Sequence, residues 1–572
     1  MKHRSIPSDS RILFFTTSPR SPHKILPEVK LLIENFEGRP WDKKTQTEYM
    51  KSLVQSDFFE GEGPKKNLDL AARDRVNRAP QLLGFVNLEN ALQRTPIYDK
   101  AQSGVRLNEL FLRQLLKFQL PSPLKPQNEG SSKVFWVRPY LEILRLVSEL
   151  GYLSRDELAI FGMQLTDWHK FDEVKRKVIT FRNAKKNRDR SAQSYSQFIQ
   201  EYITNETLIA FADVINKGDL TIREQKGADI DLGKFIETKS SNMYDYADAC
   251  RRYLRITGLI AIDIKTRTIS IPPARMEDVS WILNNIPRDP VFVDDINEYQ
   301  NYLFDVALPA LPSDNVSNLV SRLKALGAYT NGDEIKTVDA LKDTYASALE
   351  KNTKNEIKKE EDKLKTYAVY DDIMNVFRSL SDRATPDKPL LLEWNTWRAM
   401  TMIDHGFIDG NFTRDMNGLP EDTAGPGVPD IICHYKDFDL IIEVTMQSGR
   451  RQYNSEGEPV ADHVGRHRIQ SGKPTYCLFI APTLNENVIT YFYGIDQISM
   501  RNYGGKSQII PMSLTVFEKL VERSNASATK PNSDDLKEFL DKTLAEIETA
   551  SDETKWYQAI EHRASTWLSA SI

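Results

Sequence analysis

The sequence predicts an α+β protein of several domains, with a basic N-terminal region, a helical linker and an α/β C-terminal domain. Three observations support this fold class. The 572 residues, 40% hydrophobic and 27% charged, are enough for roughly three or four domains. From about Pro386 the pattern changes to helices alternating with short β-branched runs. Charge is also unevenly distributed, with 34 Lys and Arg against 23 Asp and Glu in residues 1–200, and 42 against 58 in the remainder.

A basic N-terminal region followed by an acidic remainder of the chain indicates that the N-terminal region binds a polyanion. Chance variation in surface charge explains the same count equally well. The first residues, MKHRSIPSDSR, lack the apolar core of a signal peptide, and no apolar run is long enough to span a membrane. Only three cysteines occur, and none are spaced like a zinc or redox pair. We therefore expect a cytoplasmic protein without disulfides or membrane partners.

The N-terminal region contains a helix-turn-helix pattern. An amphipathic helix is predicted over residues 108–120, closed by Pro121. A second begins after Pro139 and ends at Gly151. Ser154 then caps the next helix, with Glu157 three residues later completing a capping box. Two helices joined by a glycine-containing turn are typical of helix-turn-helix units.

Residues 242–273 extend this pattern to a winged helix. A helix is predicted to stop near Gly258, and strands 259–264 and 268–271 follow around a basic turn, like a wing. Nearby, residues 175–190 hold eight Lys or Arg. A solvated helix face and a phosphate-contacting surface are equally good interpretations of that run.

The rest of the chain is predicted to form a linker and an α/β domain. Residues 290–375 are mostly helical, and 350–365 have almost no apolar side chains to bury, which favours a connector between domains. Beyond it we expect a helix, a hairpin, a second helix and a strand over 475–482.

The predicted hairpin carries an acidic residue at the rim of each strand. Asp430 precedes Ile431 and Ile432, and Glu443 follows Leu440–Ile442. Two carboxylates at one sheet edge repel each other unless a cation lies between them. Carboxylates, a backbone carbonyl such as that of Val444, and waters are the ligands that Mg²⁺ prefers. Acidic residues are common at strand ends, so the pair alone does not establish a metal site.

Three further residues strengthen the prediction. Glu393 lies in an apolar helix between Leu392 and Trp394, where a carboxylate needs a partner. Glu456 and His463 are seven residues apart, so both would face one cleft if their segment is helical. A lone histidine in a helix is more often structural, but here it accompanies several acids.

These motifs together resemble the AlwI family of Type IIS restriction endonucleases, which includes site-specific nicking relatives. Within the PD-(D/E)xK nuclease superfamily, the hairpin from Pro429-Asp430 to Glu443-Val444-Thr445 is similar to the catalytic core. The wider resemblance lies in eight segments that span nearly the whole chain in order: 18–28, 73–76, 111–122, 252–259, 393–397, 429–445, 456–463 and 476–482.

The resemblance implies that three parts of the chain have different functions. Residues 1–285 would recognise DNA through winged-helix-like subdomains, 286–375 would form the helical linker, and 376–572 the cleavage domain. The implied catalytic residues are Glu393, Asp430, Glu443, Glu456 and His463, and the implied Mg²⁺ ligands are Asp430, Glu443 and Val444. Implied DNA-binding residues lie in the basic segments: Arg20, Arg73, Arg75, Lys175, Arg176, Lys177 and Arg182.

In one respect the chain departs from the superfamily pattern. Thr445 stands where a catalytic lysine is usual, so the general base is left open between Glu456, His463 and a metal-bound hydroxide.

The family also implies a prokaryotic protein that acts on double-stranded DNA beside a companion DNA methyltransferase. Residues 18–28 resemble relatives that read GAGTC. A transient homodimer or a small catalytic subunit would cut the second strand. The open alternatives are a nicking enzyme, the large subunit of a heterodimeric enzyme, a winged-helix regulator without nuclease activity, and a hydrolase of small phosphate esters.

Overall fold

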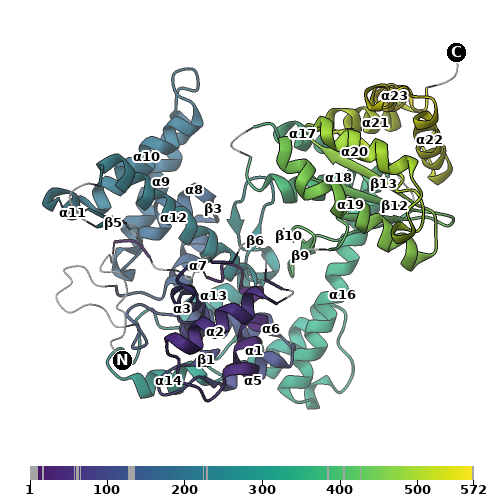
Figure 1. Cartoon of the computed structure of the whole chain (residues 1–572). Coiled ribbons are helices and arrows are strands. Elements are labelled where there is room, and N and C mark those ends of the chain that lie inside the picture. Colours follow the sequence, from purple (N-terminus) through teal and green to yellow (C-terminus); the bar gives the residue numbers. More distant parts are fainter. Residues whose placement is uncertain are drawn as a thin grey trace. The chain divides into compact units, whose positions relative to one another are not determined.

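The chain folds into two compact units, labelled by their elements in Figure 1. Unit 1 comprises residues up to Asp263 together with Arg267–Leu349, and unit 2 comprises Ile264–Thr266 and Glu350–Ile572. The computed structural model describes residues 11–569 except for 14, 16–17, 57, 60–62, 65, 126–134, 219, 223–224, 227–229, 383–384, 404–405 and 426.

The boundary between the units falls inside one long helix, α16 (Val338–Lys365). This helix contains the charged stretch 350–365 that the sequence assigns to a connector. The finer division into residues 1–285, 286–375 and 376–572 stays a prediction.

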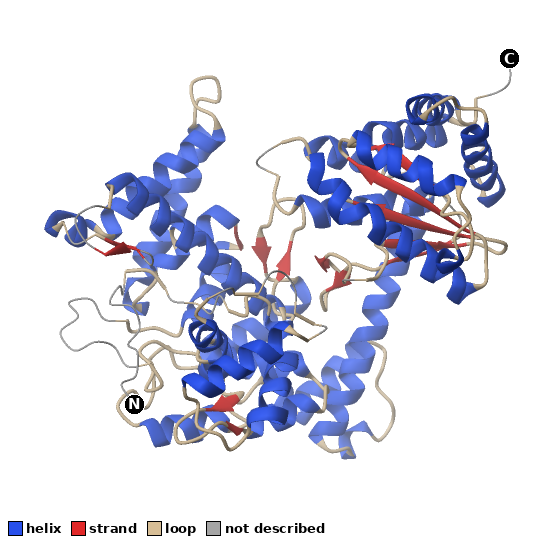
Figure 2. Cartoon of the chain, viewed as in Figure 1, coloured by secondary structure: helices blue, strands red, loops and turns tan. Residues whose placement is uncertain are grey.

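Helices and strands are mixed, which confirms the α+β character of the chain. Figure 2 shows that helices predominate and that the longest strands lie in unit 2. No described helix is both long enough and apolar enough to cross a bilayer.

Unit 1 is built mainly from helices around a large apolar core, with a smaller apolar cluster between α15 and α16. Its helices are α1 (Ile25–Phe36), α2 (Lys43–Val54), α3 (Leu68–Val76), α4 (Ala79–Leu82), α5 (Pro96–Gln102), α6 (Leu107–Lys117), α7 (Pro139–Leu150), α8 (Arg155–Ile160), α9 (Phe171–Asn187), α10 (Tyr195–Ala210), α11 (Ala212–Lys217), α12 (Leu232–Arg255), α13 (Met276–Asn285), α14 (Ile296–Phe304) and α15 (Val316–Ala325). Its strands are β1 (Val86–Asn87), β2 (Gln93–Arg94), β3 (Tyr152–Leu153), β4 (Thr221–Ile222), β5 (Gln225–Lys226), β6 (Ala261–Ile262) and β7 (Ile269–Ser270).

The two helices of the predicted helix-turn-helix form, with the predicted capping box between them. Helix α7 ends at Gly151, whose φ of 78° is a conformation that glycine adopts without strain. The Ser154 hydroxyl accepts the N–H of Glu157, and the Glu157 carboxylate accepts the N–H of Ser154 at 2.9 Å. This capping box satisfies two backbone donors at the start of α8.

A small sheet completes this part of unit 1. Strand β7 pairs antiparallel with both β6 and β3, so the predicted hairpin gains a third strand from the segment that joins α7 to α8. The sequence does not predict β3, because two residues are too few for a strand period. The helix before the hairpin, α12, also starts earlier than expected, at Leu232. The winged-helix assignment stays a prediction.

Unit 2 contains a five-stranded mixed sheet in the order β14-β13-β12-β11-β8. The predicted hairpin forms its centre, with β11 (Ile431–His434) antiparallel to β12 (Asp439–Val444). Strand β8 (Phe407–Gly410) pairs antiparallel with β11, while β13 (Thr475–Ala481) is parallel to β12, and β14 (Ile509–Ser513) is parallel to β13. A short separate hairpin joins β9 (Thr413–Arg414) and β10 (Pro420–Asp422).

Helices bury the sheet of unit 2. Every residue of β13 is buried, as is all of β12 except its last, which is expected for strands covered on both sides. Helix α18 packs against β8 and β12, whereas α19 packs against β13 and α20. The helices are α17 (Tyr370–Ser379), α18 (Lys388–Ile403), α19 (Gly449–Ser471), α20 (Glu486–Gln497), α21 (Leu514–Ala526), α22 (Ser533–Ala545) and α23 (Glu553–Thr566).

Candidate active site

Two carboxylates lie side by side at one end of the β11–β12 hairpin. Ile431 pairs with Ile442 in the antiparallel register, so Asp430 lies opposite Glu443 on the same face. Residues placed opposite each other have Cβ atoms about 4.5–5.5 Å apart. The backbone N–H of Val444 donates to Oδ2 of Asp430 at 2.8 Å, which holds this carboxylate against the end of β12.

The surroundings disfavour ionisation of both acids. Burial raises the pKa of Asp430 well above its ordinary value, and the charges of Glu443 and Glu393 raise it further. Burial also raises the pKa of Glu443, although the hydrogen bond from His463 opposes that rise. The cost of holding two charges here would fall if a cation lay between them.

Glu393 is brought to the same site from α18. It is 2% exposed, and both of its carboxylate oxygens accept the N–H of Ala424, at 3.0 and 3.3 Å. Burial raises its pKa to about 8, and repulsion from Glu443 and Asp422 adds to the rise. A charge on Glu393 therefore raises the pKa of Asp430, just as a charge on Glu443 raises the pKa of Glu393.

Helix α19 places Glu456 and His463 on the side of the sheet that carries Glu443. Nδ1 of His463 lies 2.8 Å from Oε1 of Glu443. This contact raises the pKa of His463, and burial opposes the rise. Burial raises the pKa of Glu456, whose charge also acts on Asp430 and Glu443. The structure thus brings together all five residues predicted as catalytic.

Thr445, predicted to stand where a catalytic lysine is usual, supports Glu456. It is 8% exposed, and its hydroxyl donates to Oε1 of Glu456 at 2.9 Å while accepting the N–H of Gln447 at 3.0 Å. With its hydroxyl occupied in this way, Thr445 orients Glu456 but offers no cation in place of lysine.

The acids at this site fit a hydrated divalent cation. Among the described residues, no three or more His, Cys, Asp or Glu side chains are grouped so that they could form a metal centre by themselves. Mg²⁺ rarely needs such a cage, because it keeps several waters and takes one or two protein carboxylates. Asp430 and Glu443, whose charges repel each other, would supply those two carboxylates. The carbonyl of Val444 lies at the same strand end.

One positioning residue was not found from the sequence. Asn411 follows the unpredicted strand β8, and its backbone N–H donates to the carbonyl of Asp430 at 2.9 Å. Its side-chain amide donates to the carbonyl of Pro429 at 2.6 Å. Asn411 therefore fixes the backbone on which Asp430 is mounted. In the sequence, the apolar residues Phe407 and Ile408 indicate the short strand that Asn411 follows.

A second polar cluster lies at the opposite end of β12. Asp439, 2% exposed, accepts hydrogen bonds from Nε2 of His467 at 2.8 Å and from Nζ of Lys473 at 3.4 Å. Because Asp439 and Glu443 share a face of β12, and His463 and His467 share a face of α19, two acid–histidine pairs join this helix to this strand. They fix the rotation of α19 and hence the direction of His463.

Most of the predicted DNA-binding side chains make ion pairs within unit 1. Arg20 donates to Asp245, Arg75 to Glu28, Lys175 to Glu149, Lys177 to Glu206 and Arg182 to Glu157. Nε of Arg176 donates to the carbonyl of Asp172 at 3.3 Å, and Arg73 lies in α3. Their role in DNA binding stays a prediction.

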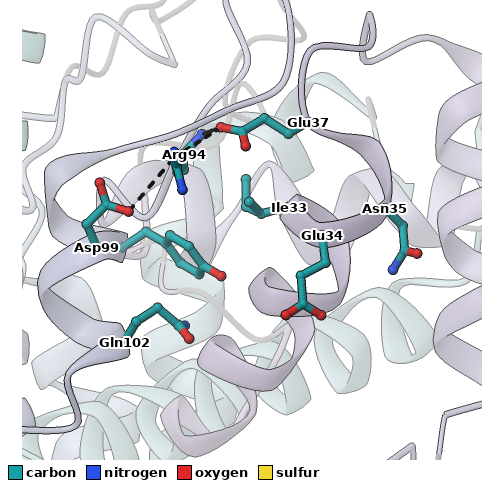
Figure 3. Close-up of a pocket in the computed structure, with 8 residues that line it drawn as sticks. Ile33, Glu34, Asn35, Glu37, Arg94, Asp99 and Gln102 are labelled. Atoms are coloured by element: carbon teal, nitrogen blue, oxygen red, sulfur yellow. Dashed lines mark hydrogen bonds and ion pairs between the residues drawn. The ribbon is translucent and has the colours of Figure 1, made fainter.

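Unit 1 also contains a polar pocket of about 540 Å³, shown in Figure 3. Glu34, Glu37 and Asp99 line it, and Arg94 pairs with Glu37 and Asp99. Three acids against one base would repel a phosphate backbone, so this pocket is a poor candidate for DNA contact.

Comparison with known proteins identifies the class. Residues 83–520, more than half of the chain, match the model of the AlwI restriction endonuclease family. The chain therefore belongs to this family. It is a restriction endonuclease, which is a site-specific deoxyribonuclease.

Two solved structures overlap with parts of the chain. One is the small subunit, R.BspD6I2, of the heterodimeric restriction endonuclease R.BspD6I, at 26% identity, with a TM-score of 0.29, covering 34% of this chain and 98% of that one. The other is the BpuJ1 endonuclease binding domain in complex with pyrene- and phenanthrene-modified DNA, at 16% identity, with a TM-score of 0.31, covering 50% and 92%. Both TM-scores are too low to define a shared fold. Among curated proteins, none matches significantly.

The raised pKa of Glu393 predicts a pH-dependent stability of the metal-free protein. Because the folded state holds this proton up to about pH 8 and the unfolded state releases it near its ordinary value of 4.5, stability falls as pH rises between these values. In EDTA, Glu393→Gln should remove part of this loss and be more stable than wild type at pH 8.5, on the order of a few kcal/mol.

Thermal unfolding followed by circular dichroism at pH 6 and 8.5 measures this difference. The exposed Glu458 of α19 offers the control, since Glu458→Gln should keep the wild-type pH dependence. Parallel pH profiles for wild type and Glu393→Gln would contradict the burial of a costly charge at Glu393.

Proposed function

We propose that this restriction endonuclease is of Type IIS, and that it recognises a short asymmetric duplex site and cuts outside it in a Mg²⁺-dependent reaction. The observation that carries this proposal is the buried acid pair Asp430–Glu443, whose repulsion a divalent cation would relieve. An antiparallel hairpin presenting two acids, flanked by helices and a further parallel strand, also supports membership of the PD-(D/E)xK superfamily.

Asp430, Glu443 and the carbonyl of Val444 would hold the metal. When bound, Mg²⁺ lowers the pKa of a ligand water and neutralises charge that develops on the phosphate. His463 keeps Glu443 oriented through the 2.8 Å contact, and this pairing favours the protonated form of His463. A protonated histidine is a poor base, so we assign proton acceptance from the attacking water to Glu456. The pKa of Glu456 is raised toward neutral pH, which suits a general base. The hydroxyl of Thr445 fixes the orientation of the Glu456 carboxylate.

Recognition of the site would belong to unit 1. The α7–α8 helix-turn-helix, helix α12 and the β6–β7 hairpin support a winged-helix module there. GAGTC is the recognition sequence that we propose on the resemblance of residues 18–28. A companion methyltransferase would protect the same sequence in the host.

The number of strands cut depends on the assembly. The described part of the chain carries one acidic site of this composition, and one site hydrolyses one strand at a time. Cutting both strands would therefore need a transient homodimer or a small catalytic subunit. Without a second site the enzyme would nick, or would act as the large subunit of a heterodimer.

The acid pair should be essential for cleavage but not for DNA binding. Asp430→Ala and Glu443→Ala should each abolish cleavage, because each removes one of two carboxylate ligands. DNA affinity should be equal to that of wild type or slightly higher, since a charge that repels phosphate is lost. Plasmid cleavage with a Mg²⁺ titration and gel-shift assays measure the two effects. Appreciable cleavage by either variant, or full wild-type cleavage in EDTA, would refute the metal assignment.

Glu456 and His463 should act on the chemical step. Glu456→Gln and His463→Ala should each lower the single-turnover rate by roughly 10²-fold, as loss of a general base or positioning group does. Thr445→Ala should be milder, because Glu456 would keep its carboxylate and lose only its orientation. Single-turnover rates at saturating enzyme, beside measured DNA affinity, separate these effects. A larger defect in Thr445→Ala than in Glu456→Gln would overturn the assignment of the base.

Recognition should be separable from cleavage. A fragment of residues 1–349 should bind the same duplex as the full chain without cutting it, because unit 1 lacks the acid pair. Its affinity should fall steeply with salt as bound phosphates release counterions. Fluorescence anisotropy with cognate and shuffled duplexes measures both properties. A well-folded fragment that does not distinguish these duplexes would show that unit 2 also reads sequence.

A further inference from the structure

The basic run of residues 175–190 has two parts that differ in their partners. In the first part, Lys175, Lys177 and Arg182 each pair with a glutamate of a neighbouring helix. The second part lies in the last turn of α9 and in the loop that leads to α10, and we call its residues 185–190 the α9–α10 tip. The tip contains one acid and four basic residues: Asp189, Lys185, Lys186, Arg188 and Arg190.

The tip stands at the end of a packed helical hairpin. Aromatic side chains join α9 to α10, with the ring centroids of Phe181 and Phe198 5.5 Å apart and those of Phe198 and Tyr202 4.8 Å apart. Phe181 is the last buried residue of α9, so the chain leaves the apolar core before it reaches the tip. Figure 1 shows the joining loop at the end of these two helices.

Two basic residues of the tip are anchored on aromatic rings of α10. Nζ of Lys185 lies 4.7 Å from the ring centroid of Tyr195. The guanidinium group of Arg188 lies 5.5 Å from the same centroid and 5.7 Å from that of Phe198. A cation is attracted to the electron-rich face of an aromatic ring. These contacts hold both side chains in place and leave their positive charges unneutralised.

The acid of the tip is engaged within its own turn. Oδ1 of Asp189 accepts the backbone N–H of Ser191 at 2.9 Å and the Ser191 hydroxyl at 2.6 Å. No basic side chain in the described part of the chain forms an ion pair with Asp189. Four basic residues against one acid give the tip a net charge of +3.

Lys186 and Arg190 are the accessible members of the tip. Both are exposed, and neither side chain forms a hydrogen bond or an ion pair with any residue that the structure describes. Like charges this close together repel each other, and a polyanion from outside the chain would relieve that repulsion. Because both side chains are exposed, such a ligand can reach them.

The hairpin is also fixed to α8, the second helix of the helix-turn-helix. The hydroxyl of Tyr195 donates to Oδ2 of Asp156 at 2.6 Å, and Nε of Arg182 donates to Oε1 of Glu157 at 2.9 Å. In addition, α9 packs against α7, and α10 packs against α8 and α12. The tip therefore belongs to the same group of helices that we propose to recognise the DNA site.

We propose that the α9–α10 tip binds the phosphate backbone of the duplex through Lys186 and Arg190. Exposed lysine and arginine side chains bind phosphates and position a duplex without reading its bases. Lys185 and Arg188 would add positive potential at the same place. The inference rests on the proposed binding of a duplex site by unit 1, and it assigns the backbone contact to residues beyond the paired part of α9.

The test uses full-length protein carrying Asp430→Ala, so that DNA is bound and not cut. A double variant, Lys186→Gln with Arg190→Gln, should weaken binding of cognate and shuffled duplexes by a similar factor, about 10-fold. It should also reduce the slope of log K against log salt by about two, because two phosphate contacts are lost. Fluorescence anisotropy at several salt concentrations measures both effects.

Lys43 and Lys44, at the start of α2, supply the matched control. They are neighbouring exposed lysines of unit 1 that lie outside the tip. Lys43→Gln with Lys44→Gln removes the same charge and should keep the parent's affinity and salt slope. Lys186→Arg with Arg190→Lys keeps both charges of the tip and should also bind as the parent does. Circular dichroism should show every variant folded, since each changed side chain is exposed.

Three outcomes would overturn the proposal. The first is a tip variant with the parent's affinity and salt slope. The second is a loss confined to the cognate duplex, which would indicate base contacts. The third is an equal loss in the α2 control, which would reduce the effect to net charge. Failure of the parent to prefer the cognate duplex would instead refute site recognition, while the salt slope of the tip variant would still decide the phosphate contact.

Discussion

Asp430 and Glu443 stand opposite each other in an antiparallel ladder, and neither can move away without disturbing a buried strand. A slip of one residue in this register would turn Glu443 to the other face of β12, which helices also cover, and would displace the apolar residues packed there. The hydrophobic packing of the sheet therefore holds two repelling carboxylates together. The proximity that a metal would use is enforced by the apolar residues of β11 and β12, not by any attraction between the acids.

The elements around this pair limit the cost of holding it. His463 contacts Glu443, and one turn further along α19 His467 contacts Asp439, so the helix is fixed to the strand at two points. The backbone N–H of Val444 donates to Asp430, and the backbone N–H of Ala424 donates to Glu393. Each contact satisfies part of a carboxylate and leaves the excess negative charge in place. Sites that retain such uncompensated charge are typical of function, because stability alone would favour apolar residues there.

In unit 1, many basic side chains pair with acidic side chains of the same unit. The basic residues of α9 look like a DNA-binding surface in the sequence, yet Lys175, Lys177 and Arg182 each pair with a glutamate. Surface ion pairs of this kind are weak, so DNA phosphates could still compete for exposed members. Arg251 of α12 differs, because it is 8% exposed and donates to Asp248 of the same helix. Burial, and not the number of basic residues, distinguishes Arg251 from these side chains.

The sequence by itself determined the elements that depend on local rules. The hairpin around Asp430 and Glu443 follows from two short apolar runs, the start of α8 from the Ser154 capping box, and the shared face of Glu456 and His463 from a seven-residue spacing. Only the tertiary structure decided what these elements meet. Strands β3, β8 and β14, the support of Asp430 by Asn411, and the partners of the basic residues all come from segments that are distant in sequence or too short for a period. Such pairings depend on packing and on the burial of charge, which a local pattern does not encode.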